Sequence, residues 1–229
     1  MSDLLCFATI ALAGFTQACL QLSFGGLILL YHSSMGRHRR RKTRGLATSY
    51  ILGVMILSFL AVSGAAFWIS QAASGGLSLE IMLICVGVFL ASAVVMWALY
   101  FRWGDHTELW LPRSISRFIS RKAKHCNDRV EAFSLGLLGA FAETPMSLAL
   151  FFLVGNCLVT VSANLQVLAL ISYLVIASAP LLILKGAIKN GSTAVAAQKW
   201  RIKHKLFARF VSSASFLVLS AFVLAFWVY

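Results

Sequence analysis

Six apolar segments, each long enough to cross a lipid bilayer, make up most of the sequence. A span of the ~30 Å hydrocarbon layer needs about 20 mostly apolar residues. Of the 229 residues, 60% are hydrophobic and 12% are charged, and this share of charge is about half that of a soluble domain. The sequence therefore predicts an all-α integral membrane protein. Its six expected transmembrane helices are roughly residues 4–31, 46–70, 79–101, 131–156, 164–185 and 206–229.

The loops between these segments alternate between strongly basic and uncharged. Residues 32–45, 102–130 and 185–209 hold six, seven and seven lysines and arginines, which are all 20 in the chain. Residues 71–78 and 157–163 hold none. Because basic loops stay in the cytoplasm, we expect both termini to lie outside a bacterial-type inner or plasma membrane. The net charge of +13 thus marks one membrane face, and nucleic acid is not an expected partner.

The second basic loop has a helical pattern of its own. In ELWLPRSISRFISRKAK (108–124), apolar residues recur at helical spacing with basic residues among them. Pro112 suits the first turn of a helix. The pattern predicts a short amphipathic helix on the inner membrane face, with anionic lipids as its partners. A calmodulin-like partner is the alternative.

The first and fourth segments resemble one another. GFTQACLQLSF (14–24) aligns with AFAETPMSLAL (140–150), which places Gln17 opposite Glu143 and Cys19 opposite Pro145. Weaker matches follow in the same order: SYIL with SYLV, then SAVV with SAFV. With three spans in each half, the two halves must be inverted in the membrane.

This arrangement predicts an inverted three-plus-three repeat. The expected domains are a first three-helix repeat (1–101), a basic cytoplasmic loop with the amphipathic helix (102–130) and a second three-helix repeat (131–229). Inverted repeats are common in secondary transporters, whose binding sites lie near the membrane midplane between the two halves.

The plan resembles the superfamily that joins lysine exporters to the membrane domains of the cytochrome c biogenesis and disulfide-reductant transporters. Those proteins have inverted three-plus-three repeats, and each repeat opens with a helix broken near a proline motif. GAFAETPM (139–146) is similar to the TPC stretch of the thiol-transporting branch, and GFTQAC (14–19) to its partner. The resemblance implies either a solute transporter or a carrier of thiol reducing equivalents.

The cysteines depart from the thiol-transporting pattern. In that branch each repeat carries a cysteine beside the proline, whereas this chain has Met146 in the second half. Cys19 lies one position away from the equivalent place in the first half and remains a redox candidate. Exchange needs two sulfurs that can meet, and Cys85 and Cys157, near the outer face, are the only conceivable substitutes for the missing partner. A reductant transporter is therefore kept as an alternative function.

Glu143 is the one acidic residue deep within a predicted span. At ~1.5 Å per residue from Glu131, it lies about 18 Å into the bilayer, and Gln17 reaches a similar depth from the other side. An ionised group there costs at least ~2.5 kcal/mol. We therefore expect Glu143 to bind a cationic substrate or to take up a proton during transport. The alternative is a neutral carboxyl group, hydrogen-bonded to Gln17 or Thr144, that only fixes the packing.

Pro145 removes a backbone donor and clashes with the carbonyl group of Phe141, so we expect an opened helix beside Glu143. Polar residues of the first span could supply further ligands or act as hydrogen bonds between helices. The candidate substrate-binding and coupling residues are Thr16, Gln17, Gln21, Glu143, Thr144 and Pro145.

The predicted function is secondary transport, expected to be export, of a small solute or cation. A non-transporting accessory membrane protein is a second alternative, and a homo-oligomer is compatible with the sequence. The five histidines lack metal-ligand spacing, and no phosphate-binding glycine loop is present. Neither a metal nor another cofactor is therefore expected, and without a nucleophile–base set the chain is not expected to be an enzyme.

Overall fold

The protein is described by a computed structural model over residues 3–20, 26–28, 30–31, 40–72, 78–98, 122–123, 126, 128–187, 196, 199–200 and 203–228. This part of the chain is helical, and no strand occurs within it. Its long helices are α1 (Asp3–Leu20), α3 (Arg40–Ala72), α4 (Leu79–Ala98), α6 (Arg129–Thr160), α7 (Ala163–Ala187) and α9 (Lys205–Val223). A π-helical turn, η1 (Leu224–Val228), continues α9.

The six predicted spans are confirmed, because the described helices include six that are long and apolar enough to cross a membrane. The chain is therefore a multi-pass membrane protein. The first span differs in detail: α1 ends at Leu20, and the residues described after it, 26–28 and 30–31, are also helical. Of the predicted amphipathic helix, Lys122 and Ala123 are helical, and the rest lies outside the described residues.

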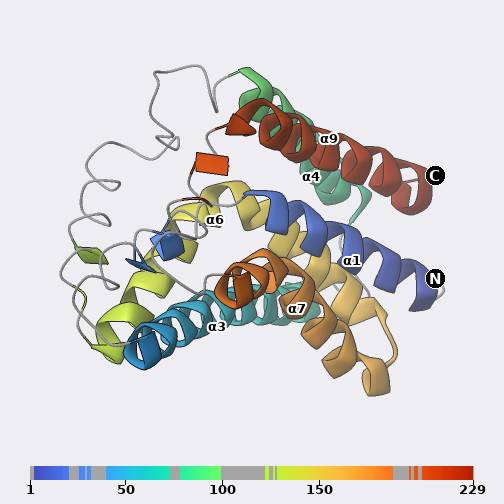
Figure 1. Ribbon diagram of the computed structural model, residues 1–229. Helices are drawn as coiled ribbons and strands as arrows, with labels where there is room; N and C mark the ends of the chain where they lie inside the picture. The colour runs from blue at the N-terminus through green and yellow to red at the C-terminus, as the bar shows by residue number, and fades with distance from the viewer. Residues whose placement is uncertain are drawn as a thin grey trace.

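Helices from the two halves of the chain pack against each other. The most extensive pairing joins α3 with α6, while α4 lies along α9. Helix α1 contacts α6, α7 and α9. Figure 1 shows α1 between the α4–α9 pair on one side and α3 and α7 on the other. This central position brings the middle of α1 close to the helices of the second half.

Glycines allow α3 and α6 to approach closely. A Cβ atom at Gly136 of α6 would overlap the carbonyl oxygen of Tyr50, and one at Gly53 of α3 would overlap that of Phe133. Further along, a Cβ atom at Gly155 would lie 2.9 Å from the backbone nitrogen of Ala66. Small residues serve this purpose in membrane helices, where dispersion forces between close backbones drive association.

Contacts at the helix ends show which ends lie together. The Arg129 side chain, at the start of α6, lies beside Gly45 near the start of α3. The Arg209 guanidinium carbon is 4.5 Å from the centre of the Trp97 ring, a cation–π contact between the start of α9 and the end of α4. At the start of α1, Asp3 accepts hydrogen bonds from the backbone and hydroxyl group of Ser162, at 3.4 and 3.1 Å.

Helix α6 runs without interruption from Arg129 to Thr160, with Pro145 inside it. The expectation of a helix broken at this proline is therefore wrong. A proline removes one backbone hydrogen bond and favours a kink, and the axis of α6 changes direction part-way along its length in Figure 1. Close packing on α3 helps to keep α6 helical, and the helix continues past Pro145 without unwinding.

Candidate functional site

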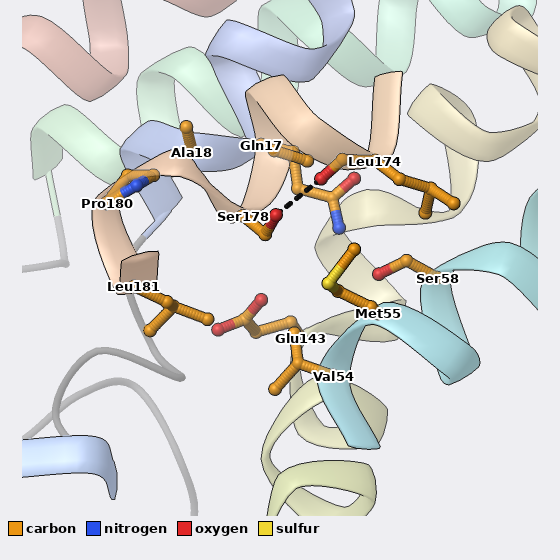
Figure 2. Close-up of a pocket in the computed structure, with 11 residues that line it drawn as sticks. Gln17, Ala18, Val54, Met55, Ser58, Glu143, Leu174, Ser178, Pro180 and Leu181 are labelled. Carbon is orange, nitrogen blue, oxygen red and sulfur yellow. Dashed lines mark hydrogen bonds between the residues drawn. The ribbon is translucent and has the colours of Figure 1, made fainter. Parts of the chain in front are cut away.

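A small, partly open cavity lies between four helices. It takes residues from α1, α3, α6 and α7, and its volume is about 30 Å³, which is enough for one or two water molecules. Figure 2 shows the side chains around it. The lining residues are Gln17, Ala18, Val54, Met55, Ser58, Glu143, Leu174, Ala177, Ser178, Pro180 and Leu181.

Glu143 contributes the cavity's carboxyl group. Its side chain is 6% exposed and comes from the middle of α6. In Figure 2 the carboxyl group points away from Val54 and toward Leu181 of α7. A buried carboxylate is costly unless a proton, a cation or hydrogen bonds compensate its charge. The cavity gives Glu143 room to receive a proton or a small cation.

Gln17 contributes the amide group from α1. Its side chain is 8% exposed, and the Tyr173 hydroxyl group of α7 donates a hydrogen bond to its Oε1 atom. Tyr173 is fully buried. In Figure 2 the nitrogen end of the amide points toward Met55 of α3. The tyrosine therefore fixes the amide of Gln17 at the cavity wall.

Two serines and a methionine, none of which was predicted from the sequence, complete the lining that can interact with a polar ligand. Ser58 and Met55 come from α3, and Ser178 comes from α7. The Ser178 hydroxyl group donates to the carbonyl oxygen of Leu174 at 2.6 Å, which leaves its lone pairs able to accept a bond from a molecule in the cavity. Ser58 is 4% exposed, and its position in the middle of an apolar span was a signal that could have been used.

The structure brings together two of the predicted site residues, Gln17 and Glu143. Thr16 is buried elsewhere: its hydroxyl group donates to Leu12 O at 2.9 Å, with Ser215 O of α9 at 3.5 Å. The Thr144 hydroxyl group donates to Ala140 O at 3.3 Å. Neither threonine lines the cavity, nor does the exposed Pro145. Gln21 lies outside the described residues.

None of the five cysteines lines the cavity. The Cys19 thiol contacts Ser215 of α9, and the Cys19 carbonyl group accepts a hydrogen bond from Ser212 at 2.8 Å. The thiol in contact with Cys157 is that of Cys6. Cys157, which the sequence offered as a conceivable substitute redox cysteine, therefore lies against the start of α1.

The donor set suits a proton or a small, weakly held cation. The lining offers one carboxyl group, one amide, two hydroxyl groups and a thioether. Within the described residues, no three His, Cys, Asp or Glu side chains gather in a group that could hold a metal ion. Strong divalent sites use several charged ligands, so this lining is better matched to a single positive charge.

Comparison with known proteins gives no match to a protein family, to a curated protein or to a solved structure. The resemblance to the exporter and reductant-transporter superfamily therefore rests on the sequence motifs and the six-span plan. The function has to be argued from the site itself.

Proposed function

We propose that the protein is a secondary transporter that moves a small cation through the cavity at Gln17 and Glu143, with Glu143 as the group that exchanges a proton for the cation. The main support for this proposal is the position of the Glu143 carboxyl group. Glu143 is buried deep in a membrane span and faces a cavity built by four helices. Ionisable groups at such places usually mark an ion or proton pathway.

The small volume favours a small cargo in the closed state. A cavity of about 30 Å³ holds a water molecule or a cation that has lost most of its water shell. A larger solute would require the helices to separate. The cation would bind the Glu143 carboxylate and the lone pairs of the Ser58 and Ser178 hydroxyl groups, and protonation of Glu143 would release it.

The helix packing supports an inverted repeat in which α1, α3 and α4 correspond to α6, α7 and α9. Helix α1 contacts α7 as α6 contacts α3, and α1 contacts α9 as α6 contacts α4. Corresponding helices also meet each other, in the pairs α1–α6, α3–α7 and α4–α9. Such a pattern is what a two-fold axis between the halves would produce.

Single residues support the same correspondence. Tyr50 in SYIL and Tyr173 in SYLV are both fully buried. Each packs on a glycine in the first helix of the other half. The Tyr50 backbone lies against Gly136 of α6. The Tyr173 ring lies against Gly14 of α1, 3.4 Å from where a Cβ atom on that glycine would be. The cavity would then lie where the two halves meet, which is the usual position of a transport site.

The orientation that we propose places the basic loops in the cytoplasm and both termini outside the plasma membrane. Basic residues lie at the helix ends next to these loops. Arg129 lies where the starts of α3 and α6 meet, and Arg209 contacts Trp97 between the start of α9 and the end of α4. Anionic lipids would attract the same basic residues.

The test of this function uses purified protein in liposomes that contain a pH indicator. Gradients of sodium and potassium are imposed in turn. We expect one of these gradients to drive protons in the opposite direction in the wild type and not in Glu143→Gln. Glu80→Gln, at the exposed start of α4, should behave like the wild type. No cation-dependent proton movement, or equal movement with Glu143→Gln, would contradict the proposal.

A further inference from the structure

Two cysteines, Cys6 and Cys157, lie together where the start of α1 meets the end of α6, away from the basic loops. Cys6 is in the second turn of α1, and Cys157 is in the last turn of α6. Their thiol groups lie close enough to interact, and the two residues are 1% and 0% exposed. Neither residue lines the cavity. The proposed transport function therefore gives this pair no role.

The surrounding contacts hold the two sulfurs together. Cys6 Sγ is 3.4 Å from the Thr160 hydroxyl oxygen of α6, and Thr9 of α1 is a hydrogen-bonding partner of Cys157. Asp3, one turn before Cys6, is bound to Ser162 just beyond α6. Because each helix contacts the other on both sides of the pair, the sulfurs cannot easily move apart.

We propose that Cys6 and Cys157 form a disulfide bond in the mature protein. A disulfide requires Cβ atoms about 3.5–4.5 Å apart. The Thr160 hydroxyl group contacts Cys6 Sγ at 3.4 Å and the Cys157 carbonyl oxygen at 3.1 Å, so the two cysteines are held side by side. The bond also requires an oxidising compartment. The inference therefore rests on the proposed orientation, which puts this end of α1 and α6 on the outer side.

The chemistry is an exchange with a disulfide-bearing protein of the outer compartment during folding, before the helices close over the thiols. Deprotonated Cys6 or Cys157 attacks the donor disulfide and forms a mixed disulfide. The second cysteine then displaces the donor thiol and completes the new sulfur–sulfur bond. Two cysteine thiols lose two protons and two electrons, and the donor disulfide is reduced to two thiols.

This bond differs from the exchange pair of the thiol-transporting branch, whose cysteines lie beside the proline motif. Here the pair lies near the membrane surface, where it would tie together the ends of the two helices that carry Gln17 and Glu143. The outer ends of α1 and α6 would then stay joined during transport. Any opening toward the outer side would have to occur between other helices.

The test counts free thiols in the full-length protein. Cells are lysed into sodium dodecyl sulfate with excess N-ethylmaleimide and no reductant, and intact mass gives the number of labelled cysteines. With two of the five cysteines in a disulfide, we expect three labels without reductant and five after reduction. Five labels without reductant would overturn the proposal, even if an added oxidant could form the bond later.

Three variants identify the partners. Cys6→Ser and Cys157→Ser should each carry four labels, because each releases the partner thiol, whereas Cys19→Ser should carry two. Two labels on Cys6→Ser or on Cys157→Ser would show a different pairing and would also overturn the proposal. The count requires neither transport nor a folded variant at the moment of labelling, so its outcome is separate from that of the proton-flux test.

Discussion

Gln17 and Glu143 come from different halves of the chain and line the same cavity. In the proposed repeat these two residues occupy equivalent positions, one an acid and the other an amide. A site with a single carboxyl group can alternate between a proton and a cation, and the amide can remain neutral throughout the cycle.

Replacing Tyr173 by phenylalanine should disturb this site through Gln17. The change removes the hydroxyl group that donates to Gln17 Oε1 and leaves a buried acceptor without that bond, at a cost of about 1–3 kcal/mol. We expect a lower unfolding temperature in detergent and slower cation-driven proton flux. Ser70→Ala removes a hydroxyl group that is exposed and bonded to Phe67 O at 2.7 Å, and it should leave both quantities nearly unchanged. A Tyr173→Phe protein with the unfolding temperature and proton flux of the wild type would show that this hydrogen bond contributes to neither.

The close contact between α3 and α6 predicts strong effects of single methyl groups. Gly53→Ala and Gly136→Ala each place a Cβ atom on a backbone carbonyl of the other helix, and such overpacking typically costs about 1–3 kcal/mol. Gly64→Ala, also on α3, adds a methyl group where no atom lies within 4 Å. Gly53→Ala and Gly136→Ala should therefore unfold at lower temperatures than the wild type, whereas Gly64→Ala should not. Similar unfolding temperatures for all three would place the helices further apart than described here.

Cys126, just before α6, offers a pH-dependent test of the packing at the start of that helix. Burial, followed by the nearby Glu131 carboxylate, raises the pKa of its thiol from 9.0 to about 11. The reactive form is the thiolate, so alkylation of Cys126 in the folded protein should rise about tenfold per pH unit up to about pH 10. In the unfolded protein the rate should level off near pH 9.

Mass spectrometry of the Cys126 peptide follows both reactions with iodoacetamide. Because folding favours the protonated thiol, the stability from this group is present below pH 9 and is lost as the pH rises toward 11. A plateau near pH 9 in the folded protein would mean that Cys126 is not buried.

Glu143→Gln should separate stability from function. Glutamine has nearly the same shape but cannot ionise, so it avoids the cost of a charged group in the membrane, which is at least ~2.5 kcal/mol when uncompensated. We expect its unfolding temperature to equal or exceed that of the wild type, while cation-driven proton flux is lost. Glu143→Ala, which leaves a void, should unfold at a lower temperature. A strongly destabilised Glu143→Gln would indicate that the carboxyl group serves packing.

The sequence was sufficient to predict the six spans because apolar length and loop charge are local properties. It also led to Gln17 and Glu143, since a polar residue in the middle of a span is conspicuous. Met55 and Ser178 could not be assigned in this way. Whether such side chains face a cavity or another helix depends on the rotation of α3 and α7, which long-range packing decides.

The same reason explains one incorrect expectation and one contact that was not predicted. Pro145 lies within a continuous helix, because contacts along the whole of α6, including those at Gly136 and Gly155, hold its turns in place. Cys157 meets Cys6 because α1 crosses the end of α6, and nothing in the spacing of cysteines along the chain reveals a contact between helices so far apart in sequence.

The most direct test of the central claim asks whether the cavity opens to both sides of the membrane. Ser58→Cys, made in a variant that lacks the five native cysteines, is exposed to a membrane-impermeant thiol reagent in sealed vesicles of each orientation. A transporter of the proposed kind predicts labelling from both faces, with Glu143→Gln shifting the balance between them. Labelling from one face alone, or from neither, would contradict transport through this cavity.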